Sequence, residues 1–132
     1  MDQWDSQRRE LWDVCMEMYR RGLVSAYSGN ASLRLEGGAG AVRKTHASPL
    51  LLITPTRRPY YRLKPEELVV VNLEGEPVED GPVPSSETAL HLEIYRQRSD
   101  VAAVAHTHSV YASALAVAGK ELPPIVDEMV MA

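Results

Sequence analysis

Three short aliphatic runs, each ended by polar or turn-forming residues, set the strongest limit on how this chain can fold. The runs are Leu50–Ile53, Val69–Leu73 and Val101–Ala105. Each run is too short for a typical helix and is bounded by turn signals, so we expect three buried β-strands. A fourth stretch, residues 31–35, alternates apolar and polar residues in the manner of a half-buried strand.

Helical patterns separate these runs. In residues 5–21, the side chains of Leu11, Cys15 and Met18 fall on one stripe, and the opposite face is polar and includes Arg8. This spacing predicts an amphipathic helix that packs against the sheet. Cys15 has no group nearby in the sequence that would generate a thiolate, so we interpret it as a core residue and not as a nucleophile.

Two further helices follow serine residues. Ser85 or Ser86 can cap a helix over about 87–98, and Ser109 can cap another over 110–118. Strands and helices therefore alternate, but the glycine fingerprint of a dinucleotide-binding fold is absent and several strand connections are hairpin-like. We expect an α/β fold with a mixed, mainly antiparallel sheet flanked by helices.

The composition fits one globular domain over residues 1–132. Of these 132 residues, 45% are hydrophobic and 24% are charged, which suffices for a single core. The net charge of -4 argues against a general nucleic-acid binder. No apolar run approaches the roughly 20 residues of a membrane-spanning helix. Cys15 is the single cysteine, which excludes an intramolecular disulfide and indicates a reducing cytoplasm.

Two histidines follow the third aliphatic run. His106 and His108 are separated by one residue, and side chains two apart in a strand lie on the same face. Both imidazoles can then converge on one metal ion, and zinc accepts imidazole nitrogen. The alternative interpretation is that two polar residues simply close a strand and precede a helix.

A second polar cluster starts the second predicted helix. Ser85 and Ser86 offer two hydroxyl groups next to the free N–H groups of a helix start, which is a typical site for phosphate. Glu87 would repel phosphate unless a cation lies nearby, so its presence indicates either a metal or a catalytic base. The alternative is an ordinary helix cap with a glutamate in the first turn.

Two more loops carry groups that suit an anion. The N–H groups of residues 28–30, Ser-Gly-Asn, can form a concave anion nest, although a tight turn explains the same residues. Residues 54–56, Thr-Pro-Thr, add hydroxyl groups, and Arg57 and Arg58 add positive charge. Of the other histidines, we expect His91 to support the site or to pack inward.

These motifs, in this order along the chain, resemble the class II aldolase/adducin family, which includes L-fuculose-1-phosphate aldolase. Each motif is weak alone, but five in sequence order are specific. They are Ala26–Ser32, Leu52–Thr56, Leu68–Val71, Pro84–Glu87 and Ala105–His108.

The resemblance implies a role for eight residues. It makes Glu87 the catalytic acid/base, and it makes His106 and His108, with Glu87 part of the time, the ligands of a Zn²⁺ ion. The phosphate of a sugar-phosphate substrate would be held by a further set, namely Gly29, Asn30, Thr56, Ser85 and Ser86.

The implied activity is that of a lyase, the zinc-assisted aldol cleavage of a phosphorylated ketose through an enediolate. Epimerases, decarboxylases and dehydratases of sugar phosphates share these residues within the family, and a non-catalytic, adducin-like interaction domain is an alternative of a different class. The resemblance also implies a three-layer α/β/α fold, a cytoplasmic enzyme and a homotetramer with active sites between subunits.

The chain departs from the family pattern at three points. Arg57 stands where the family has glycine, and it would either add a phosphate contact or obstruct the pocket. Asp127 stands where the aldolase has a tyrosine that donates a proton. The family's third zinc histidine lies beyond position 132, so we expect a member that lacks the C-terminal third of the family fold.

Overall fold

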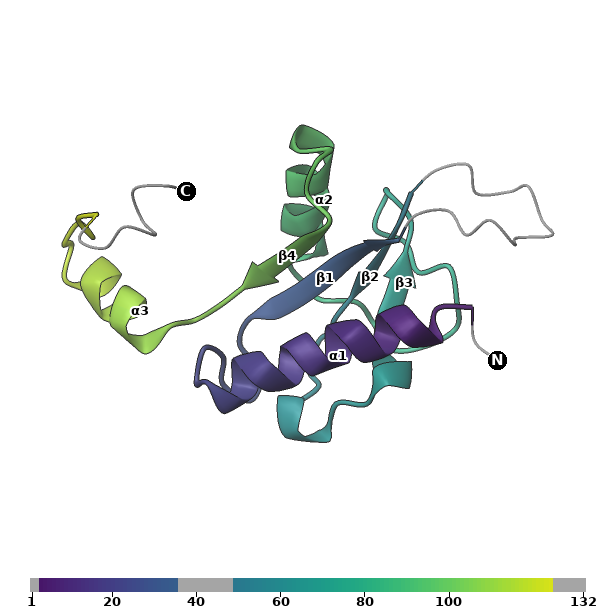
Figure 1. The fold of residues 1–132 in the computed structure, drawn as a ribbon, viewed down its shortest axis with the longest axis horizontal. Helices are drawn as coiled ribbons and strands as arrows, with labels where there is room; N and C mark the ends of the chain where they lie inside the picture. Colours follow the sequence, from purple (N-terminus) through teal and green to yellow (C-terminus); the bar gives the residue numbers. More distant parts are fainter. Residues whose placement is uncertain (1–2, 36–48, 125–132) are drawn as a thin grey trace.

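The computed structural model describes residues 3–35 and 49–124, and its central element is a four-stranded antiparallel sheet in the order β3-β2-β1-β4 (Figure 1). The strands are β1 (Asn30–Leu35), β2 (Leu50–Ile53), β3 (Val69–Val71) and β4 (Ala103–His106). The four predicted strands are therefore present. Every strand pairing in the described residues is antiparallel.

Helices cover both faces of the sheet. The described residues form α1 (Asp5–Arg20), α2 (Thr88–Gln97) and α3 (Val110–Val117), together with two short 3-10 helices, η1 (Tyr60–Arg62) and η2 (Pro65–Glu67). Figure 1 shows α1 along one face, α2 on the other, and α3 at the far end of β4. The expected α/β fold with a sheet between helices is confirmed.

Alternation along the central strands divides the core in two. Leu52 packs toward α1 together with Cys15, whereas its neighbours Leu51 and Ile53 pack toward Leu92 of α2. Because successive side chains of a strand point to opposite faces, a strand buried on both sides is aliphatic throughout. This explains why β2 and β3 are uninterrupted aliphatic runs.

Arg8 lies in the core and not on the predicted polar face. Only 5% of Arg8 is exposed, because its guanidinium donates to the carbonyl of Leu68 and pairs with the carboxylate of Glu79. A buried charge needs such partners to offset the loss of hydration.

The prediction that β4 is buried is wrong for one of its faces. Ala103 and Ala105 are exposed, while Val104 packs into the α2 core. β4 ends the strand order, and no residue of α3 is buried against it. Within residues 3–35 and 49–124, no element therefore covers the exposed face of β4, although its residues are aliphatic.

Asp127, named above as a departure from the family pattern, lies outside the described residues. In the described ranges, no helix combines the length and the apolar character needed to cross a membrane.

Candidate functional site

The polar loops at one end of the sheet are tied together by backbone hydrogen bonds. Thr54, at the end of β2, donates its N–H to the carbonyl of Ala31 in β1 at 3.1 Å. The N–H of Ser85 donates to the carbonyl of Thr54 at 3.0 Å, and the N–H of Thr56 donates to the carbonyl of Val83 at 2.9 Å. These bonds hold the segment before α2 against the end of β2.

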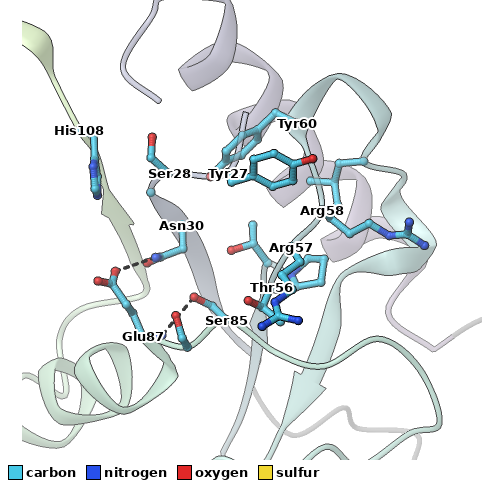
Figure 2. A pocket seen from close by; sticks show the side chains of 15 residues that line it. Tyr27, Ser28, Asn30, Thr56, Arg57, Arg58, Tyr60, Ser85, Glu87 and His108 are labelled. Atoms are coloured by element: carbon cyan, nitrogen blue, oxygen red, sulfur yellow. Dashed lines mark hydrogen bonds between the residues drawn. The ribbon is translucent and has the colours of Figure 1, made fainter. Parts of the chain in front are cut away.

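The loops enclose a pocket with a volume of about 160 Å³, which suits a small polar ligand (Figure 2). Seven of the eight predicted site residues line this pocket, from four separate parts of the chain: Gly29, Asn30, Thr56, Ser85, Ser86, Glu87 and His108. The eighth, His106, contacts Glu87 from the end of β4. Tyr27 and Tyr60 also line the pocket, and neither was singled out from the sequence.

The N–H groups at the start of α2 were predicted to be free, but two of them donate hydrogen bonds within the protein. The helix begins at Thr88, and the N–H of Glu87 donates to the hydroxyl oxygen of Ser85 at 3.2 Å. The N–H of Thr88 donates to the carbonyl of Ser85 at 3.1 Å. Ser85 therefore occupies two donors at the helix start that the sequence suggested would be free for an anion.

Glu87 is held by residues from two strands. The amide nitrogen of Asn30 donates to its carboxylate at 2.7 Å, and Nδ1 of His106 contacts the same oxygen. The hydrogen bond from Asn30 lowers the pKa of Glu87, and His106 adds to this effect. At neutral pH the side chain of Glu87 is therefore a carboxylate, the form that can accept a proton.

The two histidines at the end of β4 lie side by side. The ring centroids of His106 and His108 are 4.9 Å apart, and the N–H of His108 donates to the carbonyl of Leu23 at 2.8 Å. Two imidazoles beside the Glu87 carboxylate are the donor types that zinc accepts. However, no three His, Cys, Asp or Glu side chains in the described ranges are grouped so that they could hold a metal ion.

His91 packs inward behind Glu87, as expected. It is 0% exposed, and its Nε2 contacts the amide oxygen of Asn30. Because the amide nitrogen of Asn30 is directed at Glu87, its oxygen accepts from His91, which must carry its proton on Nε2. Burial lowers the pKa of His91 to about 4, so the ring is neutral at neutral pH.

Two residues that the sequence did not indicate complete this arrangement. The neutral ring of His91 accepts at Nδ1 from the hydroxyl of Ser32 at 2.6 Å, and the hydroxyl oxygen of Ser32 accepts from Tyr95 at 2.9 Å. The hydrogen bonds thus run in one direction, from Tyr95 through Ser32, His91 and Asn30 to Glu87. The position of Tyr95, four residues after His91 on the same helix face, was the available sequence signal.

The fold is similar to that of solved class II aldolases. The crystal structure of L-fuculose-1-phosphate aldolase from Thermus thermophilus is similar, with a TM-score of 0.69 and 31% sequence identity. The similarity covers 94% of this chain and 57% of that one.

Sequence comparison leads to the same class. Residues 9–132 match the Class II Aldolase and Adducin N-terminal domain, and the chain belongs to this family. It is 38% identical over 121 residues to 5-deoxy-D-ribulose 1-phosphate aldolase of Bacillus thuringiensis serovar kurstaki. The aligned region covers 90% of this chain and 51% of the relative. It is 35% identical over 118 residues to L-ribulose-5-phosphate 4-epimerase UlaF of Salmonella paratyphi C. That aligned region covers 89% of this chain and 47% of the relative. The chain thus spans about half the length of these curated relatives.

Proposed function

We propose that this chain carries the sugar-phosphate site of a metal-dependent aldolase that cleaves a phosphorylated ketose. One observation supports this proposal above the others: hydroxyl groups suited to phosphate and side chains suited to zinc and to proton transfer meet around Glu87 in one pocket. The names of the relatives, which include aldolases of sugar 1-phosphates, support the same substrate class.

The phosphate group would lie among the three polar loops. Ser85 and Ser86 offer hydroxyl groups on one side of the pocket, and Thr56 offers one from the end of β2. Gly29 and Asn30 complete this set from the start of β1. Hydroxyl and amide donors bind a phosphate oxygen well where several of them converge.

Glu87 would transfer the proton. When the carbon–carbon bond of the ketose breaks, the electron pair stays on the substrate as an enediolate, and its carbon must then be protonated. A carboxylate held by Asn30 at 2.7 Å has a fixed position from which it can take up a proton and deliver it. In the reverse direction the same group removes that proton.

His106 and His108 would hold a zinc ion, with a further ligand from a shift of Glu87 or from another part of the protein. A bound zinc ion supplies Lewis acidity, which stabilises negative charge that develops on the substrate oxygens. The side chain of His106 already lies against Glu87 in the described structure, which supports a metal site next to the proton-transferring group.

A second candidate is epimerisation of a sugar phosphate, which the relative named L-ribulose-5-phosphate 4-epimerase favours. The same pocket residues serve both reactions in the family. Decarboxylation, dehydration and a non-catalytic adducin-like interaction domain remain alternatives. A single domain over residues 1–132, a homotetrameric assembly and a cytoplasmic location also remain predictions.

Binding and turnover test this proposal separately. Inorganic phosphate should bind the wild type about tenfold more tightly than a Ser85→Ala, Ser86→Ala double variant, because two hydroxyl contacts are lost. A Ser99→Ala, Ser113→Ala double variant, altered outside the pocket, is the control and should bind as the wild type does. Equal affinity of all three proteins would contradict the phosphate site.

Turnover distinguishes the two reactions. Zinc-supplemented protein is incubated with L-fuculose 1-phosphate, 5-deoxy-D-ribulose 1-phosphate or L-ribulose 5-phosphate. Release of an aldehyde supports the aldolase, whereas a 4-epimer without aldehyde supports the epimerase. Either activity should be lost in Glu87→Gln, because an amide cannot exchange the proton.

A further inference from the structure

Arg57 has a backbone conformation that arginine rarely adopts. Its φ angle is 55°, and in the described part of the chain it is the one residue other than glycine with a positive φ. A side chain in this left-handed region crowds the following carbonyl, which makes glycine the usual residue there. Backbone strain of this kind clusters at functional sites, which directs attention to the Arg57 side chain.

The charge of Arg57 is not neutralised by a neighbour. Within residues 3–35 and 49–124, its guanidinium has no ion pair and no hydrogen bond, although the residue lines the pocket. The adjacent Arg58 differs, because its guanidinium pairs with Glu67 at 2.6 Å. Figure 2 shows Arg58 extending away from Glu87, whereas Arg57 lies on the Thr56 side of the pocket.

Three backbone N–H groups at the pocket are not available to a doubly charged anion. The N–H groups of Thr56, Ser85 and Glu87 all donate within the protein, to Val83, Thr54 and Ser85 respectively. Glu87 is also the one acidic residue among those that line the pocket, and Asn30 and His106 already contact its carboxylate. A phosphate dianion in this pocket therefore faces hydroxyl groups, one occupied carboxylate and one free guanidinium.

We propose that Arg57 is a specificity residue that binds the phosphate dianion of the substrate through its guanidinium. This inference rests on the proposed function, because it names a further contact of the same pocket. A planar guanidinium can donate two parallel hydrogen bonds to two phosphate oxygens. Arg57 thereby selects phosphorylated over unphosphorylated sugars.

Calorimetric titration with inorganic phosphate at low salt tests the contact. Arg57→Gln should raise the dissociation constant about five- to tenfold, because the two-hydrogen-bond contact is lost at an exposed position where solvent screens the charge. Arg58→Gln removes the same charge one residue away and should change it by less than about twofold. Arg57→Lys, which keeps the charge and loses the planar fork, should lie between wild type and Arg57→Gln.

Thermal unfolding of Arg57→Gly provides an independent readout. Removing the strained side chain should raise the midpoint by a few degrees while phosphate binding weakens. Tighter phosphate binding by Arg57→Gly would show that the side chain obstructs the pocket and would overturn the inference. Wild-type affinity in Arg57→Gln, with binding lost in the Ser85→Ala, Ser86→Ala variant, overturns the inference and leaves the proposed function intact. No phosphate binding by the wild type overturns both.

Discussion

Gly29 lies directly against the backbone carbonyl of His106. A β-carbon at Gly29 would come within 2.6 Å of that oxygen and 2.5 Å of Cγ1 of Val24, and the φ angle of Gly29 is +73°. The loop that starts β1 and the strand that carries His106 are thus in contact through a position without a side chain. The strand register is consistent with this contact, because Asn30, the residue after Gly29, pairs with His106 across the sheet.

Gly29→Ala should lower the free energy of unfolding by more than about 2 kcal/mol, because backbone strain and a clash with a main-chain oxygen add together. Gly22→Ala is the matched control, since Gly22 has a φ of +66° and nothing within 4 Å of an added β-carbon. The control should lose about 1 to 2 kcal/mol from strain alone. Chemical denaturation of both variants measures the difference, and equal losses would disprove the steric contact.

Zinc should bind this chain weakly. Two imidazoles from His106 and His108 with a shared Glu87 give an incomplete ligand set, and structural zinc sites gain roughly 10 to 16 kcal/mol from a full one. We expect zinc to be removed by dialysis against a mild chelator, to bind again on titration, and not to bind to His106→Ala. Tight, stoichiometric zinc that survives dialysis would show that another residue completes the site. Absence of zinc uptake by the wild type would favour the interaction domain.

His91 should fix the side-chain amide of Asn30. In His91→Leu the amide oxygen loses its donor, so the Asn30 side-chain protons should exchange with solvent about tenfold faster in NMR spectra, the equivalent of one hydrogen bond. His91→Gln keeps a donor near the Nε2 position and should retain slow exchange. The side chain of Asn72, which donates to Glu76 at the surface at 3.1 Å, is an internal control. Unchanged exchange in His91→Leu would contradict this arrangement.

Cys15 should make stability depend on alkaline pH. Burial raises the pKa of its thiol from 9.0 to about 12, so between these values the unfolded chain loses a proton that the folded chain keeps. The contribution of Cys15 to the free energy of unfolding is therefore fully present below pH 9. It falls as pH rises toward 12, by about 1.4 kcal/mol per pH unit. In Cys15→Ala this contribution should be absent. Denaturation curves of both proteins across this range measure it, and parallel slopes would refute the prediction.

The strands could be predicted because their signals are local. Leu50–Ile53 and Val69–Val71 are aliphatic on both faces, and the structure buries both faces. The burial of Arg8 could not be predicted in this way, because its partner Glu79 lies 71 residues away in the sequence.

In the candidate site, too, local motifs could be predicted and contacts between distant residues could not. The polar motifs around Asn30 and Glu87 were visible in the sequence, and the structure places them in one pocket. The hydrogen bond between Ser32 and His91 joins residues 59 apart, and nothing in the alternation of β1 distinguishes Ser32 from any other small polar residue. Which polar residue meets which depends on the pairing of strands and not on local pattern.

The outer side of β4 affects how this chain behaves at high concentration. β4 pairs with β1 on one side, and on its other side the described residues supply no strand partner. Unpaired backbone groups of an edge strand are a template for edge-to-edge aggregation. Val110, Tyr111 and Val117 of the adjoining α3 add exposed apolar surface. The strand that ends at His106 thus forms an edge that favours self-association, and we expect measurements at these imidazoles to depend on protein concentration.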